Sequence, residues 1–282
     1  MSIDEIISGE RIQAIADIYI GTGRLFNSNP YIDRSKCVEI GRINHSFYNP
    51  SVIFVYPDIL PLFPSKLVFF KNPFVLITHN SDIDIIPHPL VFSILQCEYV
   101  LRWFAQNVCL SHPKLTPIPI GIANRQWPHG DMTAFSGISE SVIMKENEIY
   151  MNFSLQTAPV LREICKKVCE SKGVVFLQNV SFAEHINRLS KYKYCICPGG
   201  NGVDTHRFWE CLFVKTIPIL LRKPFLKILC DRYKLPVVLL DSWNDLNIDN
   251  LPDYSIFDWS SFNIQLSGIK EEIAGCFNQL TF

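Results

Sequence analysis

The sequence predicts an α/β protein built on parallel β-sheets. Short apolar runs rich in Val, Ile and Phe recur along the chain, and in the second half they alternate with segments of helical periodicity. Strands that alternate with helices indicate βαβ units, whose crossovers make neighbouring strands parallel. With 282 residues, of which 48% are hydrophobic, the chain can form two domains with a core each.

Five apolar runs define the first half, and Pro or Asn stands near their ends, as is typical of strands covered on both faces. They lie at residues 51–60, 66–70, 74–80, 100–110 and 117–123. Residues 128–148 are polar without sustained periodicity and therefore indicate a boundary. We expect a first α/β domain over residues 1–146.

The second half alternates regularly between strands and helices. We expect strands at 148–155, 173–179, 193–200, 216–221 and 236–243, and helices at 158–171, 181–192, 204–215 and 224–234. A Rossmann-like parallel sheet of this kind binds ligands at the carboxyl ends of its strands. This second domain covers residues 147–265, and residues 266–282 have the amphipathic pattern of a last helix.

Composition limits the partners and the compartment. Lys and Arg number 26 against 27 Asp and Glu, so no overall field favours nucleic acid or an anionic membrane as a partner. The ten cysteines lie in apolar segments without a CxxC pair and are interpreted as buried, reduced thiols. No apolar run reaches the length of a membrane span, and the N-terminus lacks the pattern of a signal peptide. We expect a cytoplasmic protein.

The polar run PGGNGVDTHRFWE, residues 198–210, separates a predicted strand from a predicted helix. Its glycines allow the backbone to approach a phosphate, and the following helix offers unpaired N–H groups. Arg207 can pair with diphosphate oxygens and Glu210 can accept from ribose hydroxyls. The alternative is an ordinary ion pair within the helix. The predicted donor-binding residues of this run are Gly200, Asn201, Gly202, Asp204, Thr205, His206, Arg207 and Glu210.

A second turn, MNFSLQTAPVLRE at residues 151–163, follows the first strand of the same domain. Asn152, Ser154 and Thr157 can donate to phosphate oxygens, and Arg162 can pair with them. The alternative is a Thr cap and a surface arginine. Because turns after parallel strands meet at one edge of the sheet, the two turns together predict a nucleotide site.

These runs, together with THNSD, WFAQN, PIPIGIAN and WPHGD, resemble the exostosin-like glycosyltransferases of large algal DNA viruses and some bacteria, over residues 9–245. The resemblance implies a GT-B fold, with two facing Rossmann-like domains, a cleft between them and a last helix that packs back on the first domain. It also implies an inverting, metal-independent transfer from a UDP-sugar, without a tightly bound cofactor. The chlorovirus xylosyltransferases of this family imply UDP-xylose as donor and a fucose-containing glycan as acceptor. Lys215 stands where many relatives have a small residue.

An inverting transfer needs a base that deprotonates the acceptor hydroxyl. The run FVLITHNSDIDII ends a predicted buried strand with His79, Asn80 and Asp82, so we expect Asp82, or else His79, to be that base. The alternative is that His79 is a buried structural histidine and that Asp82 caps the next element. Asp82 and Asp84 also match the DxD pattern of metal-dependent glycosyltransferases, but the predicted donor site has no need of a metal.

Aromatic and polar side chains that suit a sugar follow in the first half. Trp127 can stack on a sugar ring, and Asn80, His129 and Asp131 can form hydrogen bonds with the hydroxyls of that sugar. Asp131 is also a reserve candidate for the base. A non-catalytic protein that binds a sugar nucleotide or a glycan, and an epimerase or hydrolase of sugar nucleotides, are the competing interpretations.

Overall fold

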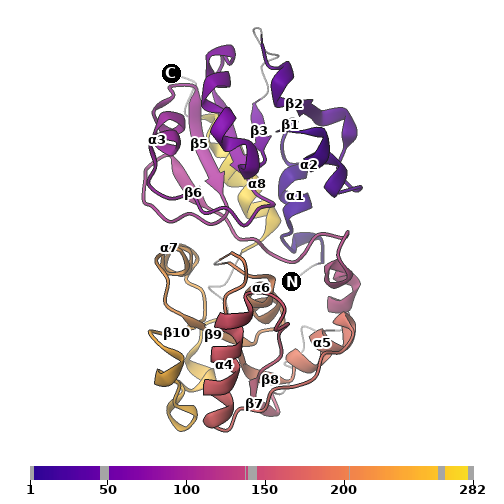
Figure 1. Ribbon diagram of the computed structural model, residues 1–282, viewed down its shortest axis with the longest axis vertical. Helices are drawn as coiled ribbons and strands as arrows, with labels where there is room; N and C mark the ends of the chain where they lie inside the picture. Colours follow the sequence, from indigo (N-terminus) through magenta and orange to yellow (C-terminus); the bar gives the residue numbers. More distant parts are fainter. Residues whose placement is uncertain are drawn as a thin grey trace. The chain divides into compact units, whose positions relative to one another are not determined.

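The computed structural model describes residues 3–44, 51–136, 138, 145–202, 204–259 and 264–278. The chain divides into two compact units, and the prediction of an α/β fold with parallel sheets is confirmed for both (Figure 1). The N-terminal unit comprises Ile7–Ile120, Asn124–Gln126 and Gln265–Phe282. The C-terminal unit comprises Met1–Ile6, Gly121–Ala123 and Trp127–Ile264.

The N-terminal unit contains a sheet of six parallel strands in the order β2-β1-β3-β4-β5-β6. The strands are β1 (Ile18–Gly21), β2 (Cys37–Glu39), β3 (Val52–Val55), β4 (Phe74–Thr78), β5 (Val100–Ala105) and β6 (Leu115–Pro117). Every residue of β3 and β4 is buried, as expected for central strands of a sheet covered on both faces.

The helices of this unit are mostly short. They are α1 (Gly9–Ala14), α2 (Gly23–Ser28), α3 (Pro89–Gln96) and α8 (Leu266–Gly275), with 3-10 helices η2 (Arg34–Lys36), η3 (Ile40–Arg42), η4 (Pro57–Leu62) and η5 (Pro64–Phe69). The prediction of a strand at 66–70 is wrong, because Pro64 starts a helical turn there and fixes its φ.

The C-terminal unit contains a sheet of four parallel strands in the order β10-β9-β8-β7. These are β7 (Asn147–Tyr150), β8 (Tyr192–Ile196), β9 (Ile217–Leu221) and β10 (Val238–Leu240), with helices α4 (Pro159–Ser171), α5 (Phe182–Leu189), α6 (His206–Phe213) and α7 (Pro224–Tyr233). The 3-10 helices are η1 (Ile3–Glu5), η6 (Pro128–Gly130), η7 (Met132–Phe135), η8 (Trp243–Asp245), η9 (Ile248–Asn250) and η10 (Tyr254–Ile256).

The predicted strand at 173–179 is absent from this sheet. Leu177 N donates to Met151 O (2.8 Å), but the side chain of Asn152 then occupies the carbonyls of Leu177 and Gln178 at 3.0 and 2.9 Å. The side-chain amide of Asn152 thus takes the place of the backbone hydrogen bonds that a strand would make beyond the end of β7.

The division between the units falls at Trp127, earlier than the predicted change at residue 147. The ring of Phe135 in η7 contacts Phe182 of α5 and Phe213 of α6, which attaches this segment to the C-terminal unit. Part of the stretch predicted as a linker, residues 137 and 139–144, lies outside the described residues. The last helix, α8, belongs to the N-terminal unit.

Lys215 directly follows α6 and its C-cap. It has a φ of 56°, in the left-handed region where glycine is the favoured residue. Among the described residues, no helix is long and apolar enough to cross a bilayer.

Candidate functional site

The two turns predicted to bind a nucleotide lie side by side in the C-terminal unit. The first follows β8, and Gly200 N donates to Gly202 O (3.3 Å) within it. A Cβ atom at Gly200 would lie 3.2 Å from Nη2 of Arg162 and 3.7 Å from Cγ2 of Thr157, both from the second turn and its helix. The lack of a side chain at Gly200 therefore lets the second turn and α4 approach the first.

Arg162 joins these turns. Its Nε donates to the carbonyl of Gly199 (2.9 Å) and its Nη1 donates to the carbonyl of Ser154 (2.8 Å), while Nη2 points to Gly200. Burial, and then the charge of Arg207, lower the pKa of Arg162, and no carboxylate of the described residues neutralises it. The turns thus hold a half-buried positive charge that no described carboxylate balances.

A second guanidinium approaches from α6. Nε of Arg207 donates to Oε2 of Glu210 (2.8 Å), and Nη1 donates to the carbonyl of Asn152. Burial lowers the pKa of Arg207, but the charge of Glu210, together with interactions with three cysteines, raises the pKa above its usual range. Nη2 has no hydrogen-bond partner among the described residues, so it can serve a ligand.

Glu210 is buried between two cationic or proton-donating groups. Its Oε2 lies 3.1 Å from Nε2 of His185, whose Nδ1 lies 2.9 Å from the hydroxyl of Tyr150. Burial raises the pKa of Glu210, but the charges of Arg207 and His185 and their hydrogen bonds hold it well below its usual range. The carboxylate is therefore ionised and fixes the orientation of Arg207.

His185 and Tyr150 are site residues that the sequence interpretation missed. Tyr150 ends β7, and His185 lies on the buried side of α5, 25 residues before Glu210. The only signal was a histidine among the apolar positions of an amphipathic helix, which more often marks a core residue than a site.

The helices that follow the two turns begin without a side-chain cap. The N-cap residues are Ala158 for α4, with a φ of 44°, and Thr205 for α6. Asp204, predicted as a cap, accepts from Nε1 of Trp209 (2.8 Å), and Oγ1 of Thr205 is buried without a partner in the described part of the chain. Uncapped helix N-termini carry free N–H groups and a partial positive charge, and both attract anions.

The remaining predicted donor residues differ in their placement. The side chain of Asn152 is 5% exposed and donates to three groups of residues 177–179, so it supports the turn from within. Oγ of Ser154 accepts from Gln156 N (3.2 Å). Ser154, Thr157 and Gly202 are half-buried and Asn201 is exposed at the turns.

Three aromatic side chains line up at the start of α6. The rings of Trp127 and His129 stack at 6.5 Å, and His129 lies 6.0 Å from the ring of His206. Nδ1 of His206 contacts the carbonyl of Gly121 (2.8 Å), and Trp127 is 53% exposed. Burial, and then the charge of His206, lower the pKa of His129. Trp127 and His129, predicted as acceptor residues of the first domain, thus belong to the unit that carries the Gly-rich turn.

In the N-terminal unit, His79 is engaged at both ring nitrogens. Nε2 contacts the carbonyl of Pro119 (2.9 Å), Nδ1 accepts from Asn80 N (2.8 Å), and the residue is 1% exposed. Since Pro119 O can only accept, Nε2 carries the proton, and this geometry favours the interpretation of His79 as a buried structural histidine.

Asn80 and Asp82 follow His79 at the end of β4. Asn80 adopts a φ of 64°, and its side-chain amide donates to Gln13 Oε1 (3.0 Å) and accepts from Asn124 Nδ2 (3.2 Å). Asp82 is exposed, so its carboxylate is open to solvent. Burial, and then the charge of Asp82, raise the pKa of Asp84.

Asp131, the reserve base, acts as a helix cap. Its Oδ1 accepts from Thr133 N (3.0 Å) and from Thr133 Oγ1 (2.7 Å) at the start of η7. These hydrogen bonds lower the pKa of Asp131, which makes it a weaker base.

Neither the models of known protein families nor the curated protein sequences contain a match to this chain.

Proposed function

We propose that the protein is a glycosyltransferase whose C-terminal unit binds the diphosphate of a sugar nucleotide. One observation carries this proposal: Arg162 lies against the Gly-rich turn and interacts with the like charge of Arg207, and only Arg207 has a carboxylate partner among the described residues. Two like charges held together are unfavourable unless an anion joins them. The uncapped N-termini of α4 and α6 at the same turns add to this attraction.

Both guanidinium groups and backbone N–H groups bind the diphosphate in this proposal. Nη2 of each arginine is placed to contact phosphate oxygens, and N–H groups of the Gly-rich turn and of α6 complete the cradle. Glu210, expected to accept from the ribose, instead has the role of a positioning residue here, because its Oε2 is engaged by Arg207 and His185. Fixed positive charge at the diphosphate also stabilises the leaving group of a transfer.

The rest of the reaction is part of the same proposal. Asp82 takes the proton of the acceptor hydroxyl while the new glycosidic bond forms with inversion, and the bond to the diphosphate breaks with its electron pair leaving on the UDP oxygen. The GT-B arrangement, UDP-xylose as donor, a fucose-containing acceptor, independence from metal and membership of the exostosin-like family follow from the resemblance of the motifs. The exposure of Asp82 supports its role over that of the enclosed His79.

Donor binding is tested by thermal shift with a panel of UDP- and GDP-sugars, with and without EDTA. A bound nucleotide sugar raises the melting temperature, because it binds only the folded chain. Arg162→Met should lower donor affinity at least tenfold, which is about 1.4 kcal/mol. Arg188→Met on α5, whose side chain is 41% exposed, should leave it unchanged. A panel without any stabilising nucleotide sugar would refute the donor site.

Transfer is tested separately with simple sugar acceptors. Asp82→Asn should keep donor binding and lose transfer, whereas full activity of this variant would exclude Asp82 as the base. Donor binding without transfer to any acceptor would indicate a binding protein. Conversion or cleavage of the donor in the absence of acceptor would indicate an epimerase or hydrolase.

A further inference from the structure

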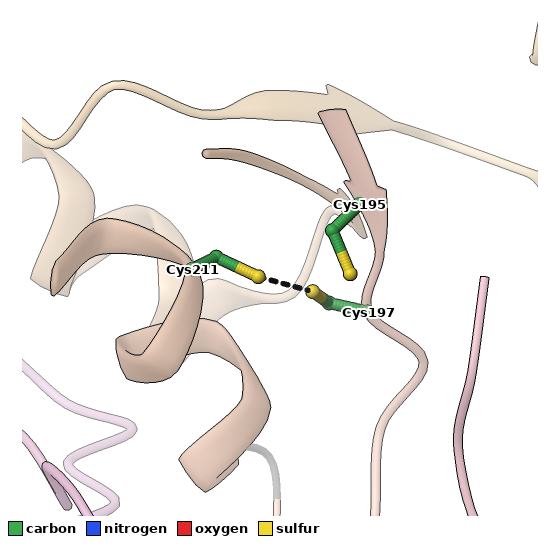
Figure 2. A group of neighbouring side chains, drawn as sticks. All are labelled: Cys195, Cys197 and Cys211. Carbon is green, nitrogen blue, oxygen red and sulfur yellow. Dashed lines mark hydrogen bonds between the residues drawn. The ribbon is translucent and has the colours of Figure 1, made fainter. Parts of the chain in front are cut away.

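Three cysteines meet directly behind the Gly-rich turn. Cys195 lies on β8, Cys197 follows the last residue of that strand, and Cys211 lies on α6 (Figure 2). Residues two apart on a strand point to the same face, so Cys195 and Cys197 both point to the helix. The three Sγ atoms lie within 4.8 Å of one another, and those of Cys197 and Cys211 are 3.5 Å apart.

Burial opposes negative charge on the three thiols, whereas two basic side chains favour it. The three residues are at most 1% exposed, and all three are free thiols. Arg207 interacts electrostatically with each of them, and His185 interacts with Cys195. Deprotonated thiols would therefore interact with the guanidinium of Arg207 and, at Cys195, with the imidazole of His185.

The number of ligands selects the metal. Soft thiolates select Cu(I) or Zn(II), but a structural zinc site needs four protein ligands. No fourth Cys, His, Asp or Glu joins the cluster in the described part of the chain. Metal–sulfur bonds of about 2.3 Å place three sulfurs in a plane about 4 Å apart. The cluster is already close to this spacing, so small rotations of the side chains would complete it.

We propose that Cys195, Cys197 and Cys211 form a three-coordinate site for Cu(I). Binding releases the thiol protons to solvent and leaves a thiolate complex whose negative charge faces Arg207. The ion ties the end of β8 to α6, the two elements that flank the Gly-rich turn.

The test is a titration of the reduced, full-length protein with Cu(I) under anaerobic conditions, in competition with the chromophoric chelator bicinchoninate. The wild type should remove one Cu(I) per chain from the chelator. Cys197→Ala and Cys211→Ala should each lower the Cu(I) affinity at least tenfold. Cys230→Ala, a buried cysteine of α7 outside the cluster, is the matched control and should bind as the wild type does.

A second measurement on the wild type does not depend on the folding of any variant. X-ray absorption of the Cu(I) complex should show three sulfur ligands and no nitrogen or oxygen ligand. Failure to take Cu(I) from the chelator, or coordination by two sulfurs, would overturn the proposal. So would Cu(I) binding that survives in Cys211→Ala but is lost in Cys165→Ala, since Cys165 and Cys169 form a separate hydrogen-bonded pair on α4.

Discussion

At the scale of single residues, the charge of Glu210 is expected to stabilise the C-terminal unit. Its carboxylate is buried with Arg207 and His185, and the loss of one partner of a buried pair typically costs about 3–5 kcal/mol. Glu210→Gln should therefore lower the free energy of unfolding by about this amount at pH 7, measured by urea denaturation. Glu170→Gln, in an exposed pair with Lys166, is the control and should cost at most about 1 kcal/mol.

The same residue predicts a pH dependence. The pKa of Glu210 is lower in the folded protein than its ordinary value of 4.5, so its contribution is present above that value and is lost as pH falls below it. The wild type should lose stability steeply in acid, and Glu210→Gln should lack this part of the slope. Equal acid slopes in the two proteins would contradict the proposed pairing.

Lys145 should make the stability of the protein depend on pH in the alkaline range. Its Nζ donates to Ser190 O, Val214 O and Thr216 Oγ1 at 2.7, 2.8 and 3.0 Å. Burial lowers its pKa from 10.5 to about 7, so the unfolded chain binds more protons between these values. This residue therefore makes the protein more stable as pH rises from about 7 to 10.

The variant Lys145→Met isolates this effect. It should lack the rise in stability with pH and should cost about 1–3 kcal/mol at pH 9, because the carbonyls of Ser190 and Val214 lose the two N–H groups of the neutral amine. Urea denaturation of both proteins at pH 7 and pH 9 measures the difference. A constant difference between wild type and variant over this range would exclude the shifted pKa.

Some of this residue chemistry is predictable from sequence, and some is not. The pair Arg207 and Glu210 follows from a spacing of three on one helix. The inward orientation of Glu210 does not follow, because it depends on His185, which is distant in the chain. For His79 the sequence left two interpretations open, and the carbonyl of Pro119, which favours one, lies 40 residues away.

At the scale of secondary structure elements, the start of α1 depends on the close approach of Gly9 to the end of β4. A Cβ atom at Gly9 would lie 1.7 Å from Oδ1 of Asn80 and 2.9 Å from Nδ1 of His79. Asn80 cannot yield easily, since its amide is hydrogen-bonded to Gln13 and Asn124. Gly9→Ala should therefore destabilise the protein by about 3 kcal/mol, although alanine is the better helix former.

Gly268 in α8 provides the matched comparison. It is exposed, and a Cβ atom there would meet no atom within 4 Å apart from the backbone of its own helix. Gly268→Ala should therefore stabilise the protein by about 0.5–1 kcal/mol. Thermal unfolding should show a lower melting temperature for Gly9→Ala and a higher one for Gly268→Ala than for the wild type. A stabilising effect of Gly9→Ala would contradict the contact with Asn80.

The elements themselves were predictable to the extent that local pattern determines them. The alternation of apolar and amphipathic segments after residue 147 predicted the four strands and the four α-helices of the C-terminal unit. The segments at 66–70 and 173–179 are as apolar as true strands. Neither forms a strand. Pro64 starts a 3-10 helix in the first segment, and in the second the side chain of Asn152 binds the backbone carbonyls that a neighbouring strand would bind.

At the scale of the whole molecule, the division of the chain into units is the property least accessible from sequence. The alternating pattern locates the start of β7, but the segment at 127–136 joins the C-terminal unit through ring contacts of Phe135 with residues far along the chain. Similarly, periodicity predicts α8, yet only tertiary contacts assign it to the N-terminal unit, beside which its yellow ribbon lies in Figure 1.

The assignment of α8 predicts where a mutation near the C-terminus acts. Ile269 is 4% exposed, and its loss to alanine should cost about 2–5 kcal/mol. This loss of stability should affect the N-terminal unit, because α8 is part of it. Hydrogen exchange followed by mass spectrometry should show faster exchange in peptides of β3, β4 and β5 and unchanged exchange in β8 and β9.

The converse variant completes this test. Ile186→Ala, at a fully buried position of α5, should accelerate exchange in β8 and β9 and spare β3 to β5. Equal acceleration in both sets of peptides for either variant would mean that the chain opens as one cooperative body. Separate responses would establish that the proposed donor unit has a stability of its own, so that its ligand can stabilise it independently of the N-terminal unit.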